Sequence, residues 1–495
     1  MNRPIQRASL AVIAIIVLLL GNATYVQVFK ADSLRNDSRN ARVLFDEYSR
    51  QRGMIVAADG TILARSVPSG NRFKYQREYP TNPNAFAPVT GFYSLRYGSD
   101  RGVEAAEAPF LSGSDDRLFT QRFVDMFSGR DPRGGNVVTT VDPKLQIAAF
   151  NALRQGQCSG PCRGAVVALE PSSGKILAMV STPSYDPNSL ATQDSQAAET
   201  SWNELTREGV PARLTNRAIA ELYPPGSTFK VVTAATGLKS GLKSSTRLTA
   251  ERTFQLPDST SVLPNNNNVT CPGAEGGTVT LAQAFEASCN TAFAELVTKK
   301  LPGDEFAEFS STAMKFGVGE DPTGIPMRVA KSTIGDLNGD PAALAQASIG
   351  ERDVRLTVLQ NAVNAATVAN GGVRMQPYVI DKLQTADLRT VSTTSPSEVN
   401  RPLSAEEAET LTDMMIRSER SAQQGQSGVA SKTGTTDPNR SGSAYAWYIA
   451  FAPSANARIA VAVMVENGNQ GAQSYGGLIA APIGRAVLNA YTGGN

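Results

Sequence analysis

Three short motifs in this 495-residue chain supply side chains for hydroxyl and amine chemistry, although the chain contains no histidine. They are Ser227-Thr228-Phe229-Lys230, Ser288-Cys289-Asn290 and Lys432-Thr433-Gly434. Without an imidazole a Ser-His-Asp triad is excluded, so a serine nucleophile needs a lysine as its base. The motifs therefore indicate acyl transfer through a serine that a lysine activates.

The local sequence favours Ser227 as the nucleophile over two other Ser-x-x-Lys matches. A Pro-Pro-Gly sequence precedes it, and an apolar run follows as far as Gly237, which predicts a short helix with Ser227 in its first turn. Lys230 would share a helix face with Ser227. The matches at Ser172 and Ser240 lie in a turn and after the helix stop, so neither has a helix to align its serine and lysine. The alternative for Ser227 is an ordinary helix cap.

The second motif falls between two helical segments, 281–287 and 291–297. At such a junction Ser288 and Asn290 could point into a cleft. Asn290 could equally cap the second helix. The sequence leaves both interpretations open.

The third motif begins a set of β-rich runs. Lys432 is followed by apolar runs at 444–452 and 457–466, which predicts an antiparallel meander with Lys432 on one strand. Gly434 removes a side chain where a second backbone could approach closely. The alternative for Lys432 is a surface lysine on an edge strand.

Taken in this order and context, the motifs resemble the transpeptidase domain of penicillin-binding proteins. The resemblance extends to residues 164–170, 179–188, 214–227, 369–372 and 447–453. The chain departs from the family pattern at Glu351, where glutamine is commoner. The resemblance implies a mixed α/β (α+β) fold for residues 161–495, with an antiparallel sheet flanked by helices and the site at the edge between the sheet and a helical subdomain.

The resemblance also implies roles for individual residues. The catalytic set is Ser227, Lys230, Ser288 and Lys432; the substrate-binding set is Asn290, Lys432, Thr433, Gly434 and Thr435; and backbone N–H groups of Ser227 and Thr435 form the oxyanion hole. A free lysine acting as base at pH 7 carries a handicap of about 4.6 kcal/mol, because so little of it is neutral. Burial and a second cation can lower its pKa by up to about 3–5 units, so we expect Lys230 to be neutral. No metal or organic cofactor is expected.

The amino-terminal segment predicts a membrane anchor. Arg3 and Arg7 precede an uncharged segment from Ala8 to Phe29, which as a helix can cross a hydrocarbon core of about 30 Å. The arginines place the amino end in the cytoplasm and the rest outside. The alternative is a signal peptide cleaved near Ala23. The family resemblance favours an uncleaved anchor, with residues 1–30 forming a cytoplasmic stub and the transmembrane segment.

Residues 31–160 are expected to form a non-catalytic, pedestal-like or dimerisation domain. Residues 52–55 and 102–104 resemble the pedestal of class B penicillin-binding proteins, and 36–40, 44–52 and 93–97 resemble the actinobacterial penicillin-binding protein A group. A class A protein would add a glycosyltransferase domain whose family motif includes a histidine. Arg52 and Glu104 are interpreted as solvated surface charges.

Composition and cysteines add weaker expectations. A net charge of +2 argues against a nucleic-acid partner. The polar segments 257–268, 385–402 and 423–428 are predicted to be surface loops. The loop from Cys158 to Cys162 could close on itself, which leaves Cys271 to pair with Cys289. A four-cysteine zinc site is conceivable, although the spacings match no usual pattern.

The activity that the resemblance implies is peptidoglycan D,D-transpeptidation, in which Ser227 attacks the penultimate D-Ala carbonyl of a stem peptide and a neighbouring amine accepts the acyl group. Expected partners are stem peptides, β-lactams that acylate Ser227, and cell-wall synthesis or division proteins bound through residues 31–160. The alternatives are a secreted β-lactamase, a D,D-carboxypeptidase, and a non-catalytic β-lactam sensor or scaffold.

Overall fold

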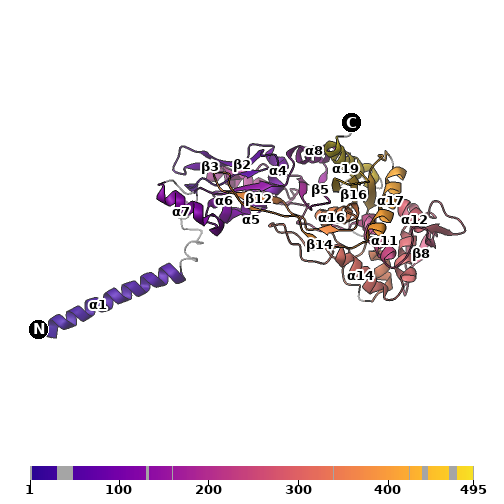
Figure 1. Cartoon of the computed structure of the whole chain (residues 1–495), viewed down its shortest axis with the longest axis horizontal. Coiled ribbons are helices and arrows are strands. Elements are labelled where there is room, and N and C mark those ends of the chain that lie inside the picture. Colours follow the sequence, from indigo (N-terminus) through magenta and orange to yellow (C-terminus); the bar gives the residue numbers. More distant parts are fainter. Residues whose placement is uncertain are drawn as a thin grey trace.

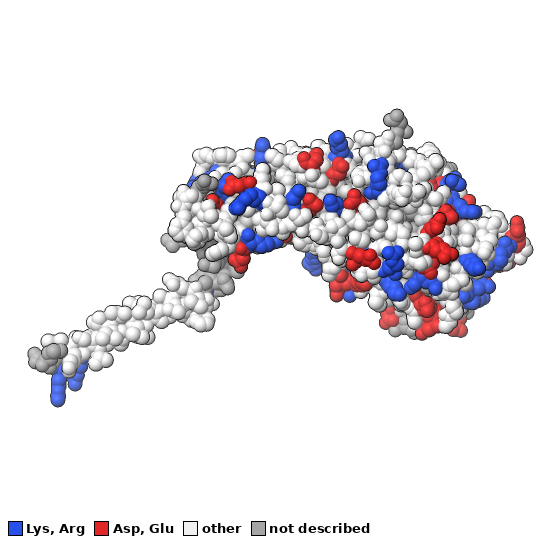
Figure 2. Space-filling view, viewed as in Figure 1, with Lys and Arg blue, Asp and Glu red and all other residues white. Residues whose placement is uncertain are grey.

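The computed structural model describes residues 3–30, 48–129, 133–158, 160–337, 339–422, 424–436, 444–467 and 476–493. Figure 1 shows an amino-terminal helix that projects from an elongated body. This helix, α1 (Arg3–Thr24), continues through a π turn at Tyr25–Phe29, and no residue in the 27-residue unit is buried. It is long and apolar enough to cross a membrane, as the sequence predicted. Figure 2 shows cationic side chains only at its free end.

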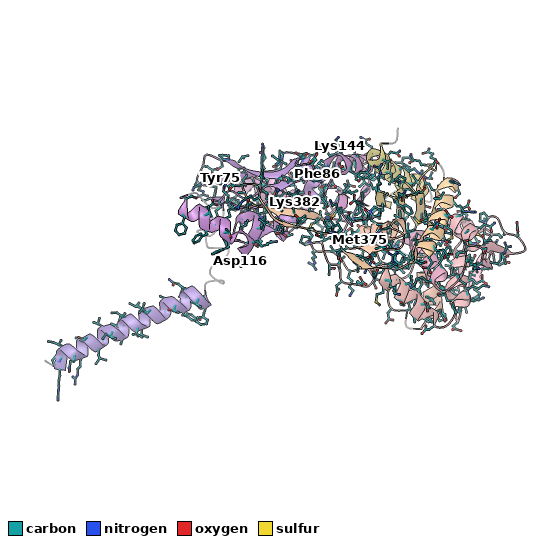
Figure 3. The ribbon with its side chains drawn as sticks, viewed as in Figure 1. Tyr75, Phe86, Asp116, Lys144, Met375 and Lys382 are labelled. Atoms are coloured by element: carbon teal, nitrogen blue, oxygen red, sulfur yellow. A yellow bond between two sulfur atoms is a disulfide. The ribbon has the colours of Figure 1, made fainter. Side chains whose placement is uncertain are left out.

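A six-stranded sheet organises the end of the body nearest α1. Its order is β13-β12-β4-β1-β2-β3, with β1 (Ile55–Val56), β2 (Ile62–Pro68), β3 (Tyr75–Glu78), β4 (Asn136–Thr139), β12 (Ile380–Gln384) and β13 (Thr390–Thr393). Strand β12 pairs antiparallel with β4, and Figure 3 places its Lys382 in the same part of the molecule as Tyr75 of β3. The sheet therefore joins chain segments from before and after the first two catalytic motifs.

Two segments predicted to be loops contain strands. β13 and β14 (Glu398–Asn400) lie within 385–402, and β9 (Val262–Pro264) lies within 257–268. Each short strand pairs with a partner strand: β13 with β12, β14 with β11 (Arg374–Met375), and β9 with β8 (Thr253–Gln255). The loop predictions were wrong because backbone pairing with these partners outweighs the polar composition.

The short helices of this end are α4 (Pro83–Thr90), α5 (Gly102–Ala106), α6 (Ala108–Ser112) and α7 (Phe119–Phe127). They bring Glu104 of α5 into the interior, where its carboxylate accepts hydrogen bonds from Arg52 Nε at 2.7 Å and Arg77 Nε at 2.6 Å. Burial alone would raise the pKa of Glu104, but Arg77 and Arg52 outweigh it and the pKa is lowered. The interpretation of Arg52 and Glu104 as solvated charges was wrong, because Arg77 completes a cluster that local sequence does not reveal.

A five-stranded antiparallel sheet forms the centre of the body, in the order β15-β16-β17-β5-β6. Its strands are β5 (Arg163–Leu169), β6 (Ile176–Thr182), β15 (Ala430–Thr435), β16 (Ala444–Ala452) and β17 (Ile459–Asn467). Helices α8 (Pro143–Arg154) and α19 (Gly476–Thr492) cover one face, and α16 (Val358–Ala369) covers the other. The predicted hairpins and meander are confirmed. Successive residues of β5 face opposite sides of the sheet, so Val166 packs in one hydrophobic core and Val167 in the other.

The third part is a helical subdomain at the end of the body opposite to α1 (Figure 1). It contains α11 (Lys230–Lys239), α12 (Leu281–Glu286), α13 (Asn290–Glu295) and α14 (Glu305–Lys315), and α17 (Ala405–Ser421) packs on α11, α12 and β15. Gly237 does not end α11 as predicted. A Cβ there would lie 3.2 Å from Leu296, so the glycine permits close packing inside the helix.

The remaining described α-helices and strands are α9 (Asn188–Ala191), α10 (Ser195–Thr206), α15 (Pro341–Ala347), β7 (Arg247–Thr249) and β10 (Thr278–Thr280). The cysteines form the two predicted disulfides, Cys158–Cys162 and Cys271–Cys289. The alternative of a four-cysteine zinc site is thereby excluded, since no thiolate remains to bind the metal.

Candidate active site

Ser227 lies in a 3-10 turn, Gly226–Phe229, that leads directly into α11. One helical turn brings Lys230 back toward it, with Nζ 3.0 Å from Ser227 Oγ. The turn needs a glycine before the serine: Gly226 has φ of 52°, and a Cβ there would lie 2.8 Å from the carbonyl oxygen of Thr435. The predicted alignment of Ser227 with Lys230 is present.

Ser288 ends helix α12 in a left-handed conformation, with φ of 59°. Its N–H donates to Phe285 O and the N–H of Cys289 donates to Ala284 O, which together form a Schellman motif. Glycine is the usual residue at this position, and a serine there costs on the order of 1–3 kcal/mol of backbone strain. The turn directs the serine toward α11, and the Cys271–Cys289 disulfide holds the next residue.

Lys432 lies on β15, which is an edge strand of the central sheet. Its partner β16 covers one edge, and β15 also contacts the Gly226–Phe229 turn that carries Ser227. The expected close approach at Gly434 is confirmed, since a Cβ there would lie 2.8 Å from Pro225 O and 3.0 Å from Thr228 Cγ2. Gly434 thus lets the strand lie against the turn that carries Ser227.

The three motifs meet at the two lysine amines. Lys230 Nζ donates to Asn290 Oδ1 at 2.7 Å and to the Ser288 carbonyl at 2.8 Å, and lies 3.3 Å from Ser288 Oγ. Lys432 Nζ donates to the same Ser288 Oγ at 2.9 Å. The Ser288 hydroxyl therefore lies between two amines, one of which also contacts Ser227. Ser172 and Ser240 lie outside this cluster.

Both amines are buried, Lys230 at 0% exposure and Lys432 at 1%. Among the described residues neither forms a salt bridge, and Phe293 and Phe285 present their rings to them. Burial, and then the positive charge of Lys432, hold the pKa of Lys230 well below its usual range, against a weaker opposing effect of Glu351. Burial lowers the pKa of Lys432 to about 7.

A cavity of about 320 Å³ opens above this cluster. Its lining includes the predicted residues Ser227, Ser288, Thr433, Gly434 and Thr435. Asn266, Ala422 and Gly476–Leu478 also line it and were missed, because no motif marks them. Asn290 lies beside the cavity, where its Nδ2 donates to Pro264 O at 3.0 Å.

A buried carboxylate behind β15 was also missed. Glu419 of α17 is 0% exposed and accepts hydrogen bonds from the Ser431 hydroxyl, from Tyr448 OH at 3.0 Å and from Arg485 Nε at 2.7 Å. It thereby connects α17 to strands β15 and β16 and to helix α19. Only the fold brings these four residues together, so spacing in the sequence carries no signal for the cluster.

The fold and the serine–lysine site define a class of acyl-transferring enzymes, and residues 164–489 match the model of the penicillin-binding protein transpeptidase domain. The chain belongs to the penicillin-binding protein transpeptidase family, and the predicted class B membership is confirmed. Residues 52–137 match the model of the penicillin-binding protein A dimerisation domain.

Individual relatives are similar over nearly the whole chain. The chain is 52% identical to peptidoglycan D,D-transpeptidase PbpA of Mycolicibacterium smegmatis and 51% identical to PbpA of Mycobacterium tuberculosis, over 99% of each chain in both cases. The ceftriaxone acyl-enzyme of penicillin-binding protein A from M. tuberculosis superposes with a TM-score of 0.84 at 49% identity, covering 90% of this chain and 99% of that one. The penicillin G acyl-enzyme gives the same score, with coverage of 90% and 100%.

Proposed function

We propose that this chain is a peptidoglycan D,D-transpeptidase that cross-links stem peptides through an acyl-enzyme on Ser227. The observation that carries the proposal is the distance of 3.0 Å between Ser227 Oγ and a buried lysine amine whose pKa is well below its usual range. The names of the PbpA relatives and the acyl-enzyme structures of M. tuberculosis penicillin-binding protein A support the same activity.

In the acylation step, neutral Lys230 accepts the Ser227 proton while Oγ attacks the penultimate D-Ala carbonyl of a stem peptide. The oxyanion is bound by the N–H groups of Ser227 and Thr435. Strand geometry supports the second donor: Thr436 N donates to Tyr445 O on β16, so the N–H of Thr435 points to the opposite, cavity-facing edge. The tetrahedral intermediate then loses the terminal D-Ala.

The leaving amine needs a proton, and the Ser288 hydroxyl is placed to relay one. It contacts both amines, so the proton taken by Lys230 can pass through Ser288, with Lys432 orienting the hydroxyl from the other side. In the second half-reaction the incoming amine gives up a proton along the same path and takes the acyl group. The Ser227 hydroxyl is restored and no cofactor is consumed.

The substrate would bind along the open edge of β15 as an added strand. Thr433 and Thr435 line the cavity, where their hydroxyls and the Lys432 amine can bind the terminal carboxylate. Asn290 would bind a substrate amide. Its Oδ1 accepts from Lys230 and one Nδ2 hydrogen is donated to Pro264 O, so the second Nδ2 hydrogen and the second Oδ1 lone pair remain for a substrate amide.

The same site would make the chain a β-lactam target, since a strained β-lactam carbonyl would react with Ser227 as the stem peptide does. We place the catalytic part outside the cytoplasm, with α1 as a single-pass anchor whose Arg3 and Arg7 remain inside. Residues 31–160 would form the non-catalytic domain and contact proteins of cell-wall synthesis, with division as the expected process.

The test compares Lys230→Ala and Ser227→Ala with wild type in the detergent-solubilised full chain. Lys230→Ala should slow acylation by fluorescent penicillin by about 10²–10⁴-fold, and Ser227→Ala should abolish it. Thermal unfolding should change little, because removing Lys230 removes a poorly accommodated buried amine. Unchanged labelling of Lys230→Ala would reject Lys230 as the base.

Product analysis separates the remaining activities. With a stem-peptide donor and an acceptor amine, a transpeptidase forms cross-linked product, whereas a carboxypeptidase forms only the shortened stem. A β-lactamase would release hydrolysed penicillin rapidly instead of retaining the acyl group on Ser227. Rescue of a knockout by Ser227→Ala would assign the chain a scaffold role.

A further inference from the structure

Helix α7 has its polar and apolar faces reversed relative to the body it packs on. Phe119, Phe123 and Phe127 follow one another at one-turn intervals and are 63%, 50% and 73% exposed. Gln121 and Asp125 are buried, and neither amide atom of Gln121 has a hydrogen-bond partner in the described structure. Surface helices of soluble proteins turn the apolar stripe inward. The outer face of α7 is therefore suited to a non-aqueous neighbour.

The outer face is continuous rather than a set of single exposed residues. The Phe119 and Phe123 ring centroids lie 6.3 Å apart and those of Phe123 and Phe127 4.6 Å apart, and Val124 is 54% exposed beside them. Other exposed large apolar side chains of the described body, such as Val262, are scattered singly. A contiguous exposed apolar strip marks an interaction site, whereas scattered residues do not.

The position of α7 indicates what covers this face. Gln51 lies near the start of the described body, a short distance in the sequence after α1. Its carbonyl oxygen accepts a hydrogen bond from Gly134 N at 2.9 Å, and its backbone forms an isolated parallel β-bridge with Arg133. Arg133 follows α7 closely in the sequence, so α7 lies beside the point where the anchor segment joins the body. Figure 1 shows α7 at the end of the body nearest α1, and Figure 3 shows Asp116, which precedes α7, at the same edge.

We propose that the outer face of α7 (Phe119, Phe123, Val124 and Phe127) inserts into the outer leaflet of the membrane that holds α1. The proposal rests on the anchoring role proposed above for α1. A short amphipathic helix with aromatic residues on one face lies in the plane of the membrane interface. Because α1 already holds the chain at the bilayer, α7 binds at a high effective concentration and needs little intrinsic affinity.

Two attachments would fix the orientation of the body, which a single tether cannot do. The helical subdomain lies at the end of the body opposite to α1 and α7 (Figure 1). The cavity is lined by Ser288 of this subdomain and by Thr433–Thr435 of β15, so it lies between the subdomain and the central sheet. With α7 in the interface, the open edge of β15 is held away from the membrane, in the space where the cell wall lies. The inserted helix therefore sets the distance at which the enzyme meets its polymer.

The test uses the full chain reconstituted into lipid nanodiscs that each hold one copy of the protein. All four native cysteines are in disulfides, so a single introduced cysteine can carry an environment-sensitive fluorophore. Val124→Cys probes α7 and leaves its three phenylalanines intact. Val262→Cys, at a residue 47% exposed on β9 in the opposite end of the body, is the matched control. Lipid-attached nitroxides should quench the label at 124 severalfold more than the label at 262.

Adding Phe123→Asp to Val124→Cys should remove the excess quenching while penicillin acylation of Ser227 stays at its wild-type rate. Equal quenching at positions 124 and 262 would overturn the proposal. If the label at position 124 is shielded from water only in nanodiscs that hold two copies of the chain, the outer face of α7 binds a second copy. That result would also overturn the proposal. A chain that fails to co-elute with nanodiscs refutes the anchor and this proposal together, whereas loss of acylation alone would count only against the proposed activity.

Discussion

Two buried clusters of ionisable side chains, one in the amino-terminal part and one between the central sheet and the helical subdomain, differ in how their charges are matched. In the amino-terminal part, the Glu104 carboxylate is held by Arg52 and Arg77, so opposite charges are matched. In the active site, Lys230 and Lys432 share the Ser288 hydroxyl, and among the described residues no carboxylate forms a salt bridge with either. The first cluster keeps its groups ionised, and the second lowers the pKa of both amines.

The difference separates stability from reactivity. A buried carboxylate with two arginines is fixed in one protonation state over the physiological pH range, which suits a structural connection between α5 and the strands around it. Two buried amines that form no salt bridge with any described residue are costly when charged, so the site favours a neutral lysine that can accept a proton. The same degree of burial therefore serves a structural connection in one cluster and prepares the other cluster for chemistry.

The largest effect should come from breaking the matched cluster. Glu104→Gln leaves two buried arginines without their carboxylate and should destabilise the chain by about 3–5 kcal/mol. Thermal melting of the solubilised chain measures this loss. The matched control is a triple variant in which Glu104, Arg52 and Arg77 are all replaced by apolar residues of similar size. This variant should lose less stability than Glu104→Gln. An unchanged melting temperature for Glu104→Gln would show that the cluster is not a structural connection.

The next effect concerns the unmatched cluster. Lys432→Met removes the positive charge that adds to burial in lowering the pKa of Lys230, so that pKa should rise and acylation at neutral pH should fall by about 10-fold or more. Stability should be unchanged or higher, because a buried cation is lost. Lys432→Arg keeps the charge and serves as the control. Stopped-flow penicillin acylation from pH 6 to 10 should show the midpoint moving to higher pH in Lys432→Met.

A smaller effect is the pH dependence of stability. Between pH 7 and the ordinary lysine pKa of about 10.4, Lys432 is protonated in the unfolded chain and mostly neutral in the folded one. The unfolded state then binds more protons, so the free energy of unfolding should rise with pH, by up to about 1.4 kcal/mol per pH unit for this lysine. Urea unfolding at pH 7.5 and 9.5 measures the rise. If the free energy of unfolding rose by the same amount in Lys432→Met, the rise could not be attributed to Lys432.

The smallest effect should come from an exposed ion pair in the same region as Glu104. Arg65 Nε lies 2.8 Å from Glu78 Oε2, but the two side chains are 43% and 40% exposed. Arg65→Ala should therefore cost less than about 1 kcal/mol. A loss as large as that of Glu104→Gln, measured by the same melting experiment, would mean that burial does not set the strength of these ion pairs.

The sequence predicted the elements that local pattern controls. Ser227 with Lys230, the junction at Ser288 and the meander that carries Lys432 were expected from helix starts, helix junctions and β-rich runs, and the structure has each of them, although the helix stop predicted at Gly237 was wrong. The pairing of the four cysteines was also predicted, since one short loop left a single remaining pair.

What the sequence did not reveal depends on contacts between distant segments. Glu104 was taken as a surface charge because Arg77 reaches it only in the folded chain, and Glu419 carries no motif although it connects three elements. Asn266 reaches the cavity from a segment predicted to be a loop. The pKa values of the two lysines likewise follow from burial, which residue spacing does not measure.

Strands β12 and β13 have a consequence for folding during synthesis of the chain. The amino-terminal sheet needs residues 380–393 to complete its order, so it cannot close when only the first 160 residues have been synthesised. Strand β4 must wait, with one edge unpaired, until nearly half of the polypeptide has followed it. A chain truncated before residue 380 would keep that edge open permanently and would present it to other chains as a template for aggregation.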